Sequence, residues 1–184
     1  IAAPASNDLI VIARHDQNKN VPFVVRAFAQ ILELQPNWEG KLVIIGKQGR
    51  ETQALLSAIK QLPQPEKVIL INGVERHRLV QLLRQSLALV SASRMEGFDY
   101  PVLEAKAEGL PTLLSNIPVH REFHGDSSEL FEINNDPSNL AAIAIRIAND
   151  YSSWRELSLS GGRICNSLTL NGQQSSIFKL LANY

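Results

Sequence analysis

The segment Leu87-Ala-Leu-Val-Ser-Ala-Ser-Arg-Met-Glu-Gly-Phe-Asp-Tyr-Pro-Val-Leu-Glu104 indicates the fold, because it joins a strand, a polar loop and the start of a helix in immediate succession. Its first four residues form a continuous apolar run, which is typical of a strand buried on both faces of a parallel sheet. Pro101 fits the first turn of a helix, which we expect over residues 102–108. Gly109 then caps this helix, and Pro111 prevents its continuation.

The same strand–loop–helix order is repeated on both sides of this segment. Apolar runs of strand length predict strands over residues 9–13, 41–46, 67–71, 87–90, 112–115 and 130–133. Helical spacing predicts helices over residues 21–34, 51–60, 75–85, 102–108 and 136–149. The alternation predicts an α/β fold, a Rossmann-like, doubly wound parallel sheet of about six strands with helices on both faces.

The helix over residues 136–149 has a clear start signal. Asp136 is the expected N-cap, with Pro137 at the first helical position. The C-terminal stretch of about residues 152–184 is expected to be helical, in two pieces split around Gly161-Gly162 and residues 169–171. Since no linker interrupts the pattern, we expect residues 1–184 to form a single domain.

The composition of the chain excludes several classes of protein. Its 184 residues are 45% hydrophobic and 20% charged, which is the balance of a globular domain. The net charge is +0, so no overall field attracts nucleic acid. The single cysteine, Cys165, excludes an internal disulfide, and we expect an inert thiol in a reducing, cytoplasmic compartment. No apolar run approaches the roughly 20 residues that span a bilayer, and no signal peptide is visible.

Ligands of doubly wound sheets bind beyond the carboxyl ends of the strands, so the loops after the strands are the candidate site. Arg14 and Lys19 lie on the loop after the first strand, just before a helix. Two cations beside a helix N-terminus suit a diphosphate, although a solvated surface loop is the alternative for this loop alone. After the second strand, Gly46 and Gly49 allow close backbone approach to a ligand, without forming a Walker loop or a GxGxxG motif.

The loop after the fourth strand carries two carboxylates. Glu96 lies on the loop and Glu104 in the first turn of the expected helix, while Gly97 lets backbone amides face a ligand. A carboxylate accepts two hydroxyl hydrogen bonds, so one can bind a ribose and the other a sugar ring. The alternative is that Glu104 only stabilises its helix N-terminus and Glu96 is a surface residue.

Taken together, these elements resemble the C-terminal domain of GT-B glycosyltransferases of the large retaining family 4. Glu96-Gly97-Phe98 through Glu104 is similar to that family's E-x7-E element, and Arg14 and Lys19 are similar to its paired cations. The resemblance extends over about residues 7–150 and includes Ala105, Ala107, Gly109-Leu-Pro111, a loop over residues 115–122 and Gly125-Asp126.

The resemblance implies that a nucleotide-diphosphate sugar, a GDP- or UDP-sugar, binds this domain. Arg14 and Lys19 would hold the diphosphate and stabilise the charge of the leaving nucleotide. Glu96 would contact the transferred sugar, beside the backbone amides of Gly97 and Phe98.

Further donor contacts follow from the same resemblance. Glu104 would bind the ribose hydroxyls, Gly46 would lie beside the donor, and Gly73 and Val74 would line the base pocket. No metal or other cofactor is expected, because members of this fold resemble one another in needing no metal and the sequence has no Asp-x-Asp triplet.

Three residues have two interpretations each. Asp99 stands where many relatives have glycine, and it would either bind a sugar hydroxyl or cap the next helix; the cap is preferred. His15 and His120 would either contact the donor or be ordinary loop residues, and the second interpretation is preferred for both.

GT-B enzymes place the acceptor on an N-terminal domain of similar size, which this sequence does not supply. The resemblance thus implies the donor-binding domain of a retaining hexosyltransferase of mannose or glucose type, inactive in isolation. Its acceptor would be a glycan or a polyprenyl-linked chain in surface polysaccharide biosynthesis, with peripheral membrane association of the full-length protein left open. Trp154 and Phe178 would contact the other domain or, as we prefer, pack on this domain's own core.

Two other functions are compatible with an α/β sequence of this kind. A catalytically incomplete binding or interaction module would keep the fold without turnover, but the four charged residues Arg14, Lys19, Glu96 and Glu104 favour the enzyme. An epimerase-like sugar-nucleotide enzyme is disfavoured, because it requires a glycine-rich dinucleotide loop after the first strand.

Overall fold

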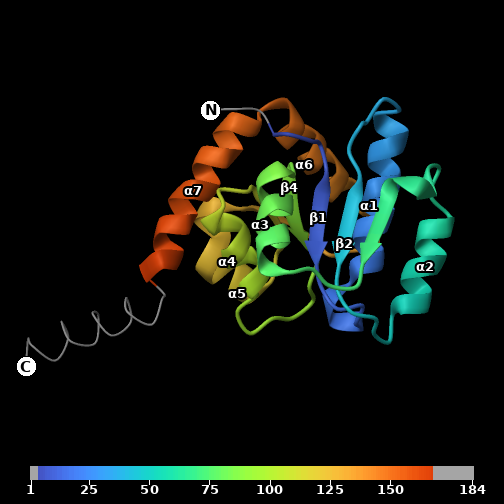
Figure 1. Cartoon of the computed structure of the whole chain (residues 1–184), viewed down its shortest axis with the longest axis horizontal. Helices are drawn as coiled ribbons and strands as arrows, with labels where there is room; N and C mark the ends of the chain where they lie inside the picture. The colour runs from blue at the N-terminus through green and yellow to red at the C-terminus, as the bar shows by residue number, and fades with distance from the viewer. Residues whose placement is uncertain (1–3, 168–184) are drawn as a thin grey trace, which may run out of the picture.

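The computed structural model describes residues 4–167, with side chains described as far as residue 162. Its centre is one six-stranded sheet with helices on both faces (Figure 1). The strands are β1 (Leu9–Ile12), β2 (Leu42–Ile45), β3 (Val68–Ile71), β4 (Ala88–Ser91), β5 (Thr112–Ser115) and β6 (Glu129–Phe131). Every neighbouring pair is parallel, which confirms the predicted Rossmann-like, doubly wound architecture.

The strand order is β3-β2-β1-β4-β5-β6. The chain therefore winds outward from β1 in one direction and then, from β4, in the other. Residue Leu9 of β1 pairs with Leu42 of β2 on one side and with Ala88 of β4 on the other. In sheets of this kind a crevice opens at the carboxyl ends of the two central strands, where the order reverses. The loops after β1 and β4 flank that crevice.

Seven α-helices and three 3-10 helices lie between or after the strands within the described residues. The α-helices are α1 (Val21–Leu34), α2 (Thr52–Lys60), α3 (Arg76–Gln85), α4 (Tyr100–Ala107), α5 (Pro118–His124), α6 (Ser138–Asn149) and α7 (Tyr151–Ser167). The 3-10 helices are η1 (Gln17–Lys19), η2 (Pro65–Lys67) and η3 (Gly125–Ser127).

The hydrophobic core has two halves, one on each face of the sheet. Leu9 and Val11 of β1 pack with α1, α2 and α6, whereas Ile10 packs with α3 and α4 on the opposite face. Side chains of a strand alternate between faces, so a strand that is apolar throughout is buried on both sides. This explains why the continuous apolar run of β1 has no polar alternation.

The structure corrects the predicted break at Gly161-Gly162, because α7 runs through both residues without interruption. A Cβ atom on Gly161 would meet Ser127 Oγ at 2.2 Å, and one on Gly162 would meet the Lys106 carbonyl oxygen at 2.7 Å. The two glycines therefore let α7 lie close against α4 and η3 (Figure 1). The predicted break at residues 169–171 lies outside the described residues.

Two further predictions about helix starts are corrected. Residues 115–122 were expected to be a loop, but Pro118 begins α5. Helix α6 begins at Ser138 rather than at Pro137, so Pro137 occupies the N-cap position that was predicted for Asp136. The Asp136 carboxylate accepts hydrogen bonds from the Ser138 amide at 2.9 Å and from the Ser138 hydroxyl at 2.7 Å. Gly109 has φ +69°, as the predicted helix cap requires.

The C-terminal aromatic residues were predicted to pack on the core. Trp154 does so, partly buried against the α1–α6 side, with the Arg146 guanidinium 5.4 Å from its ring. Phe178 and the side chain of Cys165 lie outside the described part of the chain. No helix among the described residues is long and apolar enough to cross a membrane.

Candidate functional site

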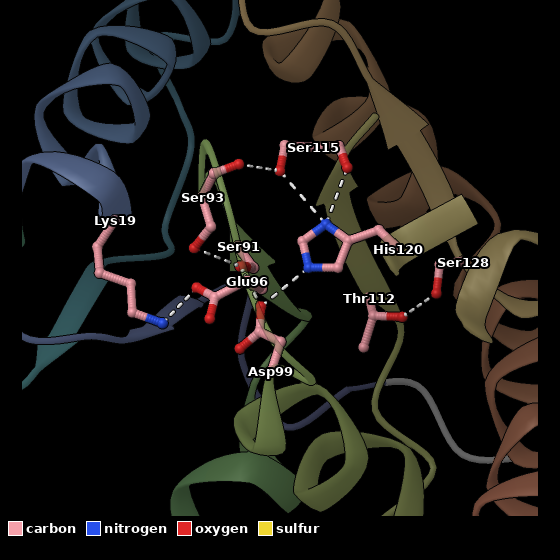
Figure 2. Close-up of polar contacts among 9 residues, drawn as sticks. All are labelled: Lys19, Ser91, Ser93, Glu96, Asp99, Thr112, Ser115, His120 and Ser128. Atoms are coloured by element: carbon pink, nitrogen blue, oxygen red, sulfur yellow. Dashed lines mark hydrogen bonds and ion pairs between the residues drawn. The ribbon is translucent and has the colours of Figure 1, made fainter. Parts of the chain in front are cut away.

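The two loops at the central crevice are joined directly to each other. They comprise residues 13–20 after β1 and residues 92–99 after β4. The Arg94 amide donates to the Asn18 carbonyl oxygen at 2.7 Å, and the Arg94 guanidinium donates to Asn20 Oδ1 at 3.2 Å. The ammonium of Lys19 forms an ion pair with Glu96 across the crevice (Figure 2). The fold thus brings together two of the three predicted catalytic residues, which are 77 positions apart in the chain.

The Lys19–Glu96 pair is mostly buried but still reaches the surface. The side chain of Lys19 is 23% exposed and that of Glu96 is 11% exposed. An ion pair with this degree of burial is less screened by salt than one on the open surface. Its charges therefore act on any ligand that enters the crevice.

Both loops end in a residue with unusual backbone geometry. Asn20 (φ 50°) and Asp99 (φ 51°) are the only non-glycine residues with positive φ in the described part of the chain. They immediately precede α1 and α4, the helices that follow β1 and β4. A left-handed conformation costs an L-residue roughly 1–2 kcal/mol, and such residues cluster at functional sites.

Asp99 is the N-cap residue of α4, as the preferred prediction expected, but its side chain makes no capping hydrogen bond. It points into the protein, where its Oδ2 atom accepts hydrogen bonds from Ser91 Oγ at 2.6 Å and from His120 Nε2 at 3.0 Å (Figure 2). Burial alone would raise the pKa of Asp99. The hydrogen bonds from His120 and Ser91, with the charges of Lys19 and His120, outweigh that effect and lower the pKa below its usual value.

His120 is completely buried and is bonded through both ring nitrogens. Nδ1 lies 2.8 Å from the Ser115 carbonyl oxygen, while Nε2 faces the Asp99 carboxylate. The Ser115 hydroxyl donates to the Ser93 carbonyl oxygen at 2.6 Å, so its proton is engaged there. A carbonyl and a carboxylate both require donors, and His120 therefore acts as the donor at each nitrogen. This role differs from both predictions for the residue, donor contact and ordinary loop.

Phe98 belongs to a small aromatic cluster. Its ring makes edge-to-face contacts with Tyr100, at 5.4 Å between centroids, and with Phe123 of α5, at 5.5 Å. The neighbouring Gly97 has no atom within 4 Å of where a Cβ would lie. The backbone at Gly97 is thus open to a ligand while the residues on either side of it are anchored.

The structure places Arg14 apart from the Lys19–Glu96 pair. Its guanidinium lies 3.3 Å from Asp16 Oδ2 and donates to the Gln48 carbonyl oxygen at 3.4 Å, and its side chain is 64% exposed. Among the described residues, no hydrogen bond or ion pair joins Arg14 to Lys19 or Glu96. Arg14 and Arg50 line a hollow of about 390 Å³ beside the crevice.

A second hollow, of about 680 Å³, lies between α1 and α2. It begins at Gln17 and Asn20 and extends to Gln61 and Pro137, and neither Lys19 nor Glu96 lines it. Because Gln17, Asn20 and Arg94 belong to the two crevice loops, this hollow adjoins the predicted site at one end.

The glycines after β2 have a structural reason for their position. A Cβ on Gly46 would lie 1.8 Å from the Ala13 carbonyl oxygen, and one on Gly49 would lie 2.4 Å from Asp16 Oδ1. The close backbone approach that the sequence indicates is therefore an approach to the β1 loop. Whether Gly46 also lies beside a donor stays a prediction.

The remaining predicted residues lie near the carboxyl ends of the sheet. A Cβ on Gly73 would meet no atom within 4 Å, and Val74 is partly buried against the α3–α4 core. Glu104 is exposed and lies beyond the first turn of α4, which begins at Tyr100. The alternative role for Glu104, stabilising the helix N-terminus, is weakened because that effect is confined to the first turn.

His15 is buried against α2. Its Nδ1 atom lies 3.3 Å from Thr52 Oγ1, and burial lowers its pKa by more than neighbouring Asp16 raises it. This contact favours the preferred interpretation of His15 as an ordinary loop residue over a contact with the donor.

Sequence reasoning missed the side chains that anchor the β4 loop. Ser91 and Ser115 stand at the ends of β4 and β5, and their hydroxyls bond Asp99 and the Ser93 carbonyl oxygen. A serine that ends an apolar strand is the only signal in the sequence, and it does not identify the partner.

Between residues 4 and 162, no three His, Cys, Asp or Glu side chains lie together as metal ligands would.

Comparison with known proteins identifies the family of this chain. The family described as Glycosyl transferases group 1 matches residues 2–159. The chain is 29% identical over 144 residues to the serotype-specific mannosyltransferase WbdA of Escherichia coli, covering 76% of this chain and 17% of WbdA. It is 26% identical over 165 residues to the GDP-mannose:cellobiosyl-diphosphopolyprenol alpha-mannosyltransferase of Xanthomonas oryzae pv. oryzae, covering 86% of this chain and 43% of that protein.

A solved structure extends the similarity to the fold. The C-terminal domain of the glycosyl transferase group 1 family protein LpcC from Francisella tularensis superposes with a TM-score of 0.72 at 20% identity. The match covers 90% of this chain and 87% of that domain. By contrast, the chain spans less than half the length of the two mannosyltransferases. The chain belongs to the glycosyl transferases group 1 family, and its sheet is that of the C-terminal domains of GT-B glycosyltransferases.

Proposed function

We propose that this chain is the donor-binding half of a retaining glycosyltransferase. It would bind a nucleotide-diphosphate sugar in the crevice between β1 and β4 and present a mannose- or glucose-type hexose to a glycan or lipid-linked acceptor. One observation carries the proposal: Lys19 and Glu96, from the two loops that flank the crevice, meet across it. The names of both relatives specify mannosyl transfer, and one specifies GDP-mannose, so GDP is our first choice of nucleotide.

The proposed chemistry uses the opposite charges of this pair. In glycosyl transfer the bond from the sugar C1 to the diphosphate oxygen breaks, and its electron pair moves onto the diphosphate. The acceptor hydroxyl oxygen forms the new bond to C1, and its proton goes to an oxygen of the departing diphosphate. Lys19 would stabilise the negative charge that develops on the diphosphate, and Glu96 would lie on the sugar side. Fixed charges are effective here because they need no rearrangement during the reaction.

Binding of the donor would have to break the ion pair between Lys19 and Glu96. A diphosphate carries more negative charge than one carboxylate, so it would compete with Glu96 for the ammonium of Lys19. Glu96 would then be released toward the hexose, where a carboxylate can accept two hydroxyl hydrogen bonds. Arg14 is exposed, and within residues 4–162 its guanidinium is bonded only to Asp16 and the Gln48 carbonyl, so it can turn to the diphosphate at low cost.

The rest of the donor would extend along the carboxyl edge of the sheet. Glu104 would bind the ribose, while Gly73 and Val74 would line the base pocket. The acceptor would bind another domain, so this chain alone would be inactive. Metal independence and a cytoplasmic location are part of the same proposal.

Calorimetric titration of the chain with GDP, UDP and ADP, with and without EDTA, tests donor binding. We expect micromolar to millimolar binding of GDP in preference to the other two, unchanged by EDTA. Lys19→Ala should weaken GDP at least tenfold, whereas Lys60→Ala, which removes an exposed cation from α2, should not change it. Equal GDP affinity in the Lys19→Ala variant would remove the phosphate role. Binding of none of the three nucleotides would favour the interaction module instead.

A further inference from the structure

The β4 loop is exposed at Met95 and Gly97 and is held in place by contacts of the residues around them. A Cβ added at Gly97 would meet no atom within 4 Å, and Met95 is 72% exposed. On one side the loop is tied to the β1 loop through Arg94 and Glu96. On the other side its end is fixed by the buried carboxylate of Asp99.

Asp99 has a backbone conformation that favours glycine, and its side chain stabilises that conformation. Its φ of 51° is left-handed, and its side chain is only 3% exposed. The carboxylate is bonded to Ser91 at the end of β4 and to His120 in α5. Rotating Asp99 to an ordinary backbone conformation would break both bonds and leave Nε2 of the buried His120 without an acceptor. The side chain thus holds the backbone where a glycine would be free to move.

His120 transmits this restraint to the sheet. Its Nδ1–H donates to the Ser115 carbonyl oxygen at the end of β5, and the Ser115 hydroxyl donates to the backbone of Ser93 within the loop (Figure 2). The loop is therefore held at Ser93 and at Asp99, on either side of Glu96 and Gly97. Both attachments lead to the end of β5, because Ser115 bonds Ser93 directly and is linked to Asp99 through His120.

We propose that Asp99 and His120 are positioning residues that hold Glu96 and the Gly97 backbone in place for the diphosphate sugar. The inference rests on the proposed donor site, but it assigns neither residue a contact with the donor. The pair acts through the loop: the carboxylate fixes the backbone at its end, and the imidazole fixes the carboxylate to β5. This differs from a side-chain capping hydrogen bond, which would satisfy only the first turn of α4.

Backbone amide hydrogen exchange at residues 96–98 tests the positioning directly, without any ligand. Asp99→Gly suits φ 51° but removes the carboxylate, so we expect the same unfolding temperature within a few degrees and at least tenfold faster exchange. Asp99→Asn keeps an acceptor for His120 and should change exchange less than threefold. Asp150→Asn, another carboxylate that accepts a serine hydroxyl bond, is the distant control and should change nothing at the loop.

The coupling between the two residues is tested by a double-mutant cycle. His120→Gln should also speed exchange, and the double variant with Asp99→Gly should be no faster than the more affected single variant. Wild-type exchange in Asp99→Gly, or multiplied effects in the double variant, would overturn the proposal. If His120→Gln does not fold, the comparison of Asp99→Gly with Asp99→Asn still decides it.

GDP titration of the same variants links positioning to binding. Asp99→Gly should bind GDP at least tenfold more weakly than the wild type, and Asp99→Asn should recover most of that loss. Unchanged GDP affinity in Asp99→Gly would refute the link to the donor. If the wild type binds no nucleotide diphosphate, the proposed function fails, and the link to the donor fails with it, whatever the exchange rates show of the loop.

Discussion

The two loops that flank the crevice are built by different means. The loop after β1 is packed by backbone: Gly46 and Gly49 bring the β2 loop against it, and its charged side chain Arg14 is exposed. The loop after β4 is anchored by buried side chains, with Asp99 and His120 bonded to each other beneath it. The first loop therefore depends on two glycines of its neighbour together with the buried side chains of His15 and Asn20, and the second on a few buried polar atoms.

This difference predicts different responses to mutation. Enlarging a glycine beside the β1 loop should damage stability, because rigid backbone atoms cannot move aside. Changing a polar group beneath the β4 loop should alter binding or pH dependence with a smaller effect on the fold. Four predictions test this contrast, in order of the expected free-energy change.

The largest effect is expected from Gly46→Ala. Its Cβ would lie 1.8 Å from the Ala13 carbonyl oxygen, so β1 and β2 would have to move apart at their carboxyl ends. We expect a loss of about 3 kcal/mol in the free energy of unfolding, measured by urea denaturation. Gly73→Ala is the matched control, since a Cβ there meets no atom within 4 Å. Equal stability of the two variants would show that close packing at Gly46 is not needed.

The second prediction concerns His124, which lies buried behind the β4 loop. Burial lowers its pKa to about 4, with smaller lowering by Lys106 and His120 and an opposing effect of Asp99. Neither ring nitrogen has a hydrogen-bond partner among the described residues. Because the unfolded state takes up a proton near pH 6.5 and the folded state only near pH 4, stability should fall as the pH falls through that window.

The loss at His124 should reach about 3 kcal/mol at most, and His124→Leu should remove it from the pH profile of unfolding. His77→Leu, at a side chain that is 73% exposed, is the surface control for replacing a histidine by leucine. A profile that keeps its slope between pH 6.5 and 4 in His124→Leu would contradict the assignment.

The third prediction separates ribose from diphosphate. Glu104→Ala should weaken GDP about tenfold, or about 1.4 kcal/mol, and leave inorganic pyrophosphate unchanged. Calorimetry of both ligands measures the difference, with Glu33→Ala on the exposed face of α1 as the control. An equal loss of affinity for pyrophosphate would assign Glu104 to the phosphates instead of the ribose.

The smallest effect, with an unusual sign, is expected from Glu96→Gln. Removing the partner of Lys19 removes the competitor of the diphosphate, so GDP should bind two- to fivefold tighter, by about 0.5–1 kcal/mol. The same variant should bind GDP-mannose no better than GDP, because the proposed contact to the hexose is lost. Weaker GDP binding in Glu96→Gln would contradict the competition between carboxylate and diphosphate.

The sequence predicted the fold well because parallel strands leave a direct signal. Runs such as Leu42–Ile45 are apolar throughout, and the proline and glycine residues at the helix ends are local features. Gly161-Gly162 was interpreted as a break because glycine is a local signal for a helix end. Close packing between helices that are distant in sequence has no such local signal. The glycine pair is needed only because α4 and η3 lie against it.

The candidate site was predictable only where it resembles a motif. Lys19 and Glu96 were selected by their flanking patterns, and the fold then joined them. Asp99 and His120 were each noted as ambiguous, but their pairing depends on tertiary structure across β4 and β5, so the sequence could not show it. Burial changes the meaning of such residues, because a buried polar group must find a partner.

The most direct test of the central claim is to map the amide resonances of the chain during titration with GDP. A donor site between β1 and β4 predicts shifts at residues 14–20 and 96–99 of the two crevice loops and at Gly73 and Glu104, with little change in α6. Shifts confined to the hollow between α1 and α2, around Gln61 and Pro137, or no shifts at all, would contradict that site.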